Sequence, residues 1–425
     1  MPAAFLVISA IALLVLAFPI FLAILASTLV TFEFFGPPMP NQVLAQQLVQ
    51  GVNIFALLAV PLFIFAADII GRGQIGRRLV DLMEGLVGHY RGGLAIATVL
   101  ACAMFGAISG IGAAAVVSIG PIVYPSLVRA GYGAGFSVGL ILAASTLAMM
   151  IPPGVAMILY SIQNSTSVAR VFLAGLSSGV IFIVIISAWC WIHAWRHNIE
   201  PLPRLPFREQ VARLWRSVWA VGLPVIIFGG IYSGVFTPTE AAAAACVYAA
   251  FVEVVVYRKI KPWDLLKISQ PSAIMIATLL ILISVGGLMT WYLTLERVPD
   301  QITQLLEVVP LGGVLATINV LFLFAGMFID PNSAIIVMAP LIQPAAIAVG
   351  LDPVHLGAML VFNLAIGMIT PPFGLNIFIG ISTFRLPYFT VVKSVLPFIA
   401  IGIITLLLIT YIPELTTWLP RAVYG

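Results

Sequence analysis

The chain has 425 residues, of which 62% are hydrophobic and only 8% are charged. Soluble globular proteins carry about 25% charged residues, so this chain cannot cover a water-facing surface, and soluble enzymes and nucleic-acid-binding proteins are excluded. Its 19 Lys and Arg residues exceed its 15 Asp and Glu residues, and in so apolar a chain that excess carries information on membrane topology rather than on a nucleic-acid partner.

A helix that spans the lipid bilayer needs about 20 predominantly apolar residues. The first such run, near 3–31, is interpreted as a retained first helix rather than a signal peptide, because no basic region precedes it. In chain order, further runs lie near 53–71, 134–162, 169–194, 217–236, 240–257, 272–293, 354–384 and 390–411.

Two other apolar stretches, near 92–129 and 311–349, are too long for one span and carry small, polar and proline residues at their middles. We expect each of them to form a re-entrant helical hairpin, which enters and leaves the membrane on one side. Amphipathic segments near 76–90 and 297–309 precede the two hairpins and are expected to be interfacial arm helices, although plain amphipathic connectors fit equally well.

The distribution of basic residues tests this topology, because Lys and Arg are concentrated in cytoplasmic loops. With both hairpins re-entrant, only Arg170, Arg297 and Arg421 fall on the outer face, which predicts a cytoplasmic N-terminus and a C-terminus outside. The other 16 share the inner face: Arg72, Arg77, Arg78, Arg91, Arg129, Arg196, Arg204, Arg208, Arg213, Arg216, Arg258, Lys259, Lys261, Lys267, Arg385 and Lys393.

An internal repeat becomes visible when the chain is shifted on itself by 219 residues. Each copy contains a hairpin followed by a helix that a Pro-Pro pair breaks, and the predicted topology makes the two copies inverted, as in secondary transporters. The shift places Pro121, Pro125, Gly131, Met149, Pro152 and Pro153 on Pro340, Pro344, Gly350, Met368, Pro371 and Pro372.

Four interruptions of helical backbone follow from this pattern, namely hairpin tips at 107–113 and 329–333 and helix breaks at 150–154 and 370–374. In hydrocarbon, broken backbone is tolerated only where it is buried in protein or lines a wet cavity. Freed carbonyls can coordinate a cation, and half-helix N-termini attract an anion. An ordinary kink is the alternative for any single break.

Asp330 lies in the second tip, where an ionisable side chain costs at least about 2.5 kcal/mol and usually faces a functional cavity. It could bind a cation, or it could simply cap the following helix. Other polar residues in or near the breaks could bind ligands or bond back to their own helix: Ser109, Ser145, Thr146, Asn363, Thr370 and Asn376. No phosphate-binding loop or hydrolase motif is present, and an enzyme is not expected.

At these breaks the sequence resembles the large membrane subunit (M subunit, DctM-like permease) of tripartite ATP-independent periplasmic (TRAP) transporters. The resemblance covers nearly the whole chain. It is carried by PLFIFAADII (61–70), FGAISGIGAAAVVSIGPIVYPSLVRAGY (105–132), IPPGVAMILYS (151–161), GIYSGVFTPTEAAA (230–243), GMFIDPNSAIIVMAPLI (326–342) and LDPVHLGAMLVFNLAIGMITPPFGLNIFI (351–379).

The resemblance implies an elevator-type ion-transporter fold and sodium-coupled import of an organic acid across a bacterial inner membrane, with the C-terminus in the periplasm. It implies two partners, a small four-helix Q membrane subunit and a periplasmic substrate-binding P protein, and no cofactor besides sodium as coupling ion. The sodium ligands it implies are Ser109, Gly110, Pro152, Pro153, Asp330, Pro331, Thr370 and Pro371. Substrate-binding candidates are Ser109, Gly110, Ser145, Asn332, Asn363 and Asn376.

The first tip departs from the family pattern, because Ile111, Gly112 and Ala113 replace hydroxyl-bearing residues, and this favours backbone carbonyls as sodium ligands there. We expect residues 92–162 and 311–384 to form two transport repeats. The fixed scaffold would then comprise 1–91 with the first arm, 163–310 with the second arm, and 385–425 as a C-terminal scaffold helix.

Two alternatives to a tripartite transporter remain open from the sequence. The first is a self-sufficient sodium- or proton-coupled anion carrier of the same fold that needs no binding protein. The second is an intramembrane enzyme, which would need an acid, base or metal partner for Asp330 that the sequence does not provide.

Overall fold

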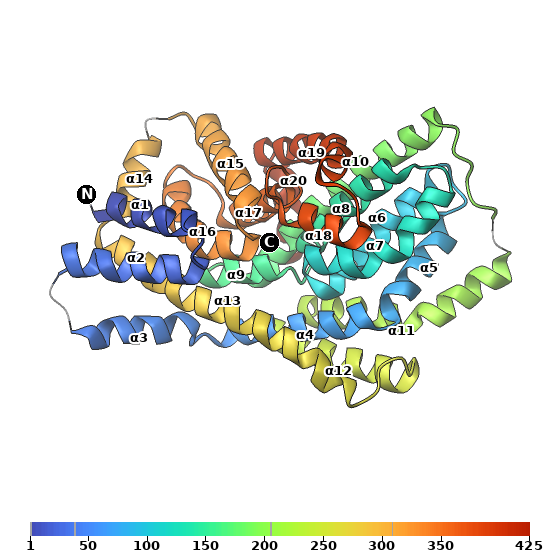
Figure 1. The fold of residues 1–425 in the computed structure, drawn as a ribbon, viewed down its shortest axis with the longest axis horizontal. Coiled ribbons are helices and arrows are strands. Elements are labelled where there is room, and N and C mark those ends of the chain that lie inside the picture. The colour runs from blue at the N-terminus through green and yellow to red at the C-terminus, as the bar shows by residue number, and fades with distance from the viewer. Residues whose placement is uncertain (1, 38–39, 205, 308) are drawn as a thin grey trace.

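The computed structural model describes residues 2–37, 40–204, 206–307 and 309–425, and within these ranges it contains helices and no strands (Figure 1). Ten helical segments of this part of the chain are long and apolar enough to cross a membrane. The prediction of an all-α polytopic membrane protein is therefore confirmed.

The N-terminal run is not one span. It forms α1 (Pro2–Val15) and α2 (Ile20–Phe35), which pack side by side in opposite directions (Figure 1). Pro19 stands immediately before α2, and a proline cannot donate a backbone hydrogen bond to a continuing helix. The prediction of a single helix near 3–31 is therefore wrong. The predicted cytoplasmic N-terminus assumed that this run crosses the membrane once, so it no longer follows from the run.

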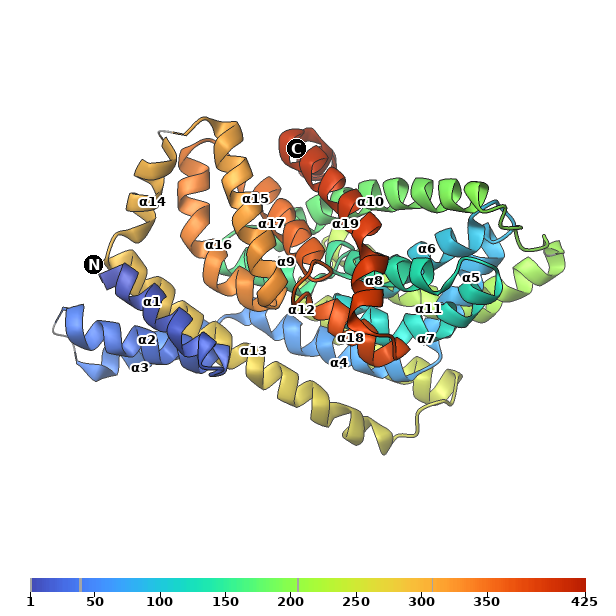
Figure 2. The ribbon, with the colours of Figure 1, turned by 45° about the horizontal axis from the view of Figure 1, so that its top comes forward.

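The next helices lie along one side of the molecule. α3 (Asn41–Val52), the short turn η1 (Phe55–Leu58) and α4 (Ala59–Arg72) follow one another, and the long α13 (Asp264–Leu295) runs beside α3 and α4 (Figures 1 and 2). The sequence did not predict α3, because its four glutamines lower its hydropathy. It also placed the start of α13 eight residues too late.

The two predicted arms are α5 (Ile75–Val87) and α14 (Val298–Glu307), although residue 308 of the second arm lies outside the described residues. The buried carboxylate of Glu253 accepts hydrogen bonds of 2.8 Å from the backbone N–H groups of Gln74 and Ile75 at the start of α5. Glu253 belongs to η2 (Val252–Val256), which continues α12 (Pro238–Phe251). This cap fastens the first arm to α12.

The hairpin helices end where the sequence predicts tips. The first hairpin consists of α6 (Gly93–Ser109) and α7 (Gly112–Arg129), and the second of α15 (Leu311–Phe328) and α16 (Pro331–Ala348). The helices of each pair pack against each other.

Both predicted helix breaks are present. The first separates α8 (Ala134–Met150) from α9 (Val155–Gln163), and the second separates α17 (Pro353–Gly367) from α18 (Leu375–Phe384). The Pro-Pro peptide bond is cis in each break.

The remaining helices are α10 (Val168–Arg196), α11 (Phe207–Tyr232), α19 (Tyr388–Tyr411) and α20 (Glu414–Tyr424). α10 packs against α6, α8, α9 and α17, while α19 packs against α8, α17 and α18. α11 instead packs against α5 and α12. The hairpins and broken helices therefore share one packed core with α10 and α19.

Candidate functional site

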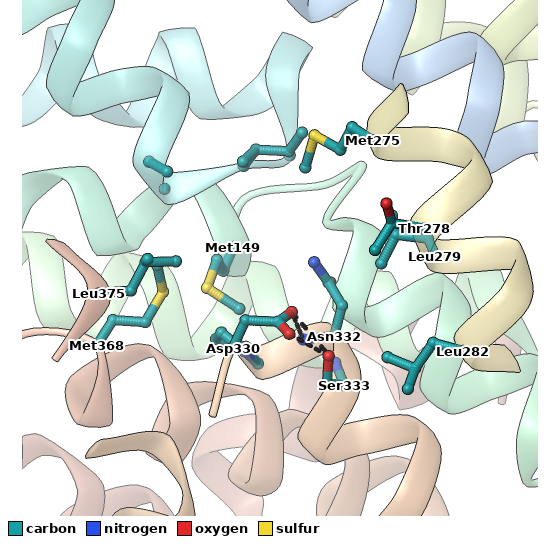
Figure 3. A pocket seen from close by; sticks show the side chains of 15 residues that line it. Met149, Met275, Thr278, Leu279, Leu282, Asp330, Asn332, Ser333, Met368 and Leu375 are labelled. Atoms are coloured by element: carbon teal, nitrogen blue, oxygen red, sulfur yellow. Dashed lines mark hydrogen bonds between the residues drawn. The ribbon is translucent and has the colours of Figure 1, made fainter. Parts of the chain in front are cut away.

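A cavity of about 260 Å³ lies where the two hairpin tips meet (Figure 3). Gly110 to Ala113 of the first tip and Asp330 to Ser333 of the second tip contribute to its wall. Met149, Met368 and Leu375 come from the edges of the two helix breaks. The cavity therefore lies between the two hairpin tips and next to both helix breaks, and we call it the hairpin-tip cavity.

The first tip rests directly on the first helix break. Gly110 has a left-handed backbone with φ 62°, and a Cβ atom there would lie 2.1 Å from the carbonyl oxygen of Pro153. The carbonyl of Gly110 accepts a hydrogen bond of 3.4 Å from the N–H of Val155. Only glycine fits this contact. The predicted ligands Ser109 and Gly110 are thus brought next to Pro152 and Pro153.

The hydroxyl of Ser109 is fully buried, and its oxygen accepts a long hydrogen bond of 3.5 Å from the N–H of Ile111. Ser109 is not among the residues that line the cavity, whereas Gly110 is. The residues of this tip that line the cavity, Gly110 to Ala113, carry no polar side chain.

Asp330 caps α16. Its Oδ1 accepts hydrogen bonds of 3.0 and 3.2 Å from the N–H groups of Asn332 and Ser333, and its Oδ2 accepts one from the Ser333 hydroxyl. The capping alternative for Asp330 is therefore realised. The same carboxylate also lines the hairpin-tip cavity, as Figure 3 shows, so capping and cation binding are compatible.

The second hairpin approaches the second break through two close contacts. A Cβ atom on Gly326 of α15 would lie 3.0 Å from the Cα of Gly367, which ends α17. The rings of Phe328 and Phe373 are 5.4 Å apart. The hydroxyl of Thr370 donates to the carbonyl of Ile366 at 2.7 Å, so Thr370 bonds back to its own helix and keeps only acceptor capacity for a ligand.

Three predicted substrate ligands, Ser145, Asn363 and Asn376, are buried and do not line the hairpin-tip cavity. The Nδ2 of Asn376 donates to the Ser145 hydroxyl oxygen at 3.0 Å, and that hydroxyl donates to the carbonyl of Leu142 at 2.7 Å. The Nδ2 of Asn363 donates to the backbone and side-chain oxygens of Asn319, both at 2.9 Å. Substrate contact by these residues stays a prediction, whereas Asn332 lines the cavity.

One whole wall of the cavity was not predicted from the sequence. Met275, Thr278, Leu279 and Leu282 of α13 line it. The spacing of these four residues places them on one face of a helix, and this is the only signal in the sequence that they form a wall together. That signal could not be used, because any apolar helix packed against a neighbour shows the same spacing.

The electrostatics of the cavity are simple. Among the described lining residues Asp330 carries the only ionisable side chain, and Asn332, Ser333 and Thr278 add neutral polar groups. Gly112 and Ala113 begin α7, and N–H groups of a first helical turn lack partners within the helix. The site can thus offer oxygen ligands to a monovalent cation and amide donors to a carboxylate.

Comparison with known proteins adds independent information. Residues 7–415 match the family described as the tripartite ATP-independent periplasmic transporter, DctM component. The ectoine/5-hydroxyectoine TRAP transporter large permease protein UehC of Ruegeria pomeroyi is 39% identical over 420 residues, which cover 98% of each chain. The C4-dicarboxylate TRAP transporter large permease protein DctM of Pseudomonas aeruginosa is 37% identical over 393 residues, which cover 92% of each chain.

A solved structure shows a similar fold at low sequence identity. The YdaH transporter of Alcanivorax borkumensis has a TM-score of 0.63 and 13% identity, and the match covers 89% of this chain and 88% of that one.

Proposed function

This chain belongs to the DctM component family of tripartite ATP-independent periplasmic transporters, and on that premise we propose that it imports a small organic acid across a bacterial inner membrane with sodium as the coupling ion. The family consists of transporter permeases and not of enzymes. A large permease of this kind works with a periplasmic binding protein and a small membrane subunit. Here we expect these to be a P protein and a four-helix Q subunit.

The observation that carries the proposal is the convergence of both hairpin tips and both helix breaks on one cavity. Broken helices that meet around a small cavity are the arrangement by which secondary transporters hold substrate and coupling ion. We place one sodium ion between Ser109–Gly110 and Pro152–Pro153, where Gly110 touches Pro153. We place another between Asp330–Pro331 and Thr370–Pro371, where the Asp330 carboxylate would supply charge.

We also propose an elevator motion, with inverted repeats as its basis. α10 and α19 each pack against helices of both repeats, which supports including them in the moving unit, although the sequence had suggested that they belong to the scaffold. The moving unit would then comprise α6 to α10 and α15 to α19. The frame would comprise α2 to α5 and α11 to α14, with the Arg72 end of α4 in the cytoplasm.

The substrate class follows from charge. The two relatives above are named for ectoine and for C4-dicarboxylates, so relatives at similar identity differ in substrate. In this chain no described basic side chain lines the hairpin-tip cavity, and a buried anion needs a compensating positive group. We therefore propose that the carboxylate enters either with its own positive group, as in a zwitterion, or with bound sodium.

Uptake into liposomes tests the proposal. The chain would be reconstituted with its Q and P partners, and uptake of ectoine, succinate, sialate, a keto acid and a sulfonate would be measured with and without an inward sodium gradient. We expect uptake of one class that requires both the gradient and the P protein. Equal uptake without the gradient would contradict sodium coupling, and uptake without the P protein would instead support a self-sufficient carrier.

A further inference from the structure

A second cavity of about 420 Å³ lies away from the hairpin-tip cavity, at the ends of three helices that pack together. It is formed by the start of α8, the last turns of α10 and the first turns of α19. We call it the α8–α10–α19 groove. Its wall contains the aromatic residues Phe136, Trp189 and Phe398 and the polar residues Thr390, Lys393 and Ser394.

The groove carries one positive charge that nothing in the described chain neutralises. Lys393 is exposed, and no carboxylate is among the residues that line the groove. The two ion pairs of the described residues are Arg213–Glu209 and Lys267–Asp264, so neither involves Lys393. The groove therefore favours an anionic group at its polar side.

The aromatic rings at the groove form a stack. The ring centroids of Tyr132 and Phe136 are 5.5 Å apart, those of Phe136 and His193 are 3.7 Å apart, and those of His193 and His197 are 4.1 Å apart. Beside this stack the indole Nε1 of Trp189 is shielded from solvent and has no hydrogen-bond partner in the described chain. On this side the groove therefore offers a ligand aromatic surface.

The position of the groove identifies the surroundings that supply such a ligand. α10 and α19 are both long and apolar enough to span a membrane. The groove lies at the end of α10 that finishes at Arg196 and at the start of α19, which follows Arg385. Trp191 and Trp195 are exposed on another face of the same end of α10, and Leu396 is exposed on α19. Basic and aromatic side chains together mark the depth of lipid headgroups.

We propose that the α8–α10–α19 groove binds an anionic phospholipid of the cytoplasmic leaflet. The phosphate would lie at Lys393 and the hydroxyl of Thr390. One acyl chain would lie along Phe136, Pro397 and Phe398. A free phosphate ion would leave this apolar half unfilled. The inference depends neither on the substrate nor on sodium coupling.

Lipid retention by the full chain tests this site. Wild type, Lys393→Glu and Lys261→Glu would be purified in mild detergent, titrated with phosphatidylglycerol, and followed by native mass spectrometry and by the thermal unfolding midpoint. Lys261 is an exposed lysine outside the groove, so its substitution makes the same change in net charge. We expect Lys393→Glu to weaken phosphatidylglycerol binding by at least about fivefold, because a headgroup contact with one basic residue is worth about 1 kcal/mol. We expect Lys261→Glu to leave phosphatidylglycerol binding unchanged.

A second variant fills the groove without changing charge. Gly135 faces it with only the Ser394 hydroxyl oxygen near the position of a Cβ atom, so Gly135→Leu should displace the lipid and reproduce the loss if Lys393→Glu folds poorly. Equal phosphatidylglycerol binding by wild type, Lys393→Glu and Gly135→Leu would overturn the proposal. So would equal loss in Lys261→Glu, or inorganic phosphate that raises the unfolding midpoint of wild type as much as phosphatidylglycerol does.

Discussion

The side-chain amide of Asn376 donates a hydrogen bond of 3.0 Å to the hydroxyl oxygen of Ser145, and both residues are fully buried. Asn376 begins the helix after the second break, whereas Ser145 lies in the helix before the first break. This single contact therefore ties the two broken helices together 231 residues apart in the chain. It lies next to the first tip, because a Cβ atom on Gly112 would be 3.7 Å from the Asn376 amide nitrogen.

Replacement of Asn376 by Ala should loosen this link. We expect a loss of about 1 to 3 kcal/mol in unfolding free energy, because a buried hydrogen bond is removed, together with a larger loss of uptake, because the geometry of the hairpin-tip cavity changes. Thermal unfolding and liposome uptake would be measured in parallel. Gln46→Ala, which removes an exposed amide from α3, is the control. Normal uptake by Asn376→Ala would contradict a role in shaping the site.

Substitution of Asp330 separates its charge from its capping function. Asn caps a helix about as well as Asp, so the unfolding free energy of Asp330→Asn should stay within about 0.5 kcal/mol of wild type. The sodium concentration for half-maximal uptake should instead rise about tenfold or more. A rise of this size is expected when a bound cation loses a charged ligand worth more than about 1.4 kcal/mol.

Asp352 provides a matched control for that experiment. Its Oδ1 caps α17 by accepting hydrogen bonds of 2.7 and 3.1 Å from the N–H groups of Val354 and His355, and Asp352 does not line the hairpin-tip cavity. Asp352→Asn should therefore leave the sodium dependence of uptake unchanged. An equal effect of the two substitutions would show that Asp330 acts only as a cap.

Gly110→Ala should abolish uptake. The left-handed backbone alone costs about 1 to 2 kcal/mol for a residue with a Cβ atom, and the added methyl group would collide with the Pro153 carbonyl. Gly131→Ala is the control, since Gly131 has φ 94° and open space around it. If both variants lose the same amount of uptake, backbone strain rather than contact between tip and break explains the effect.

The wall formed by α13 should limit access to the site. Leu282 is 4% exposed and faces the hairpin-tip cavity, whereas the neighbouring Ile281 is 46% exposed on the outside of the same helix. We expect Leu282→Trp to fill the cavity and reduce uptake to background, and Ile281→Trp to transport normally. Uptake assays on equal amounts of monodisperse protein would check both. Full uptake by Leu282→Trp would mean that substrate does not occupy this cavity.

The sequence by itself determined the class of the protein and the places where its helices break. The tips at Gly110 and Asp330 and the breaks at Pro152–Pro153 and Pro371–Pro372 follow from local chemistry, since proline removes a backbone donor and glycine permits a left-handed turn wherever the rest of the chain lies. The family resemblance is visible in the sequence because the motifs that carry it include these local interruptions.

Only the tertiary structure decided which side chains face the cavity. Ser145 and Asn376 bond to each other beside it, while Thr278 and Leu282 of an ordinary apolar helix form its wall. It also divided the first apolar run into α1 and α2 and joined α10 and α19 to the hairpins. In an almost uniformly apolar chain, hydropathy cannot distinguish a surface packed against protein from one that faces a cavity or lipid, because contacts between residues far apart in the chain make that distinction.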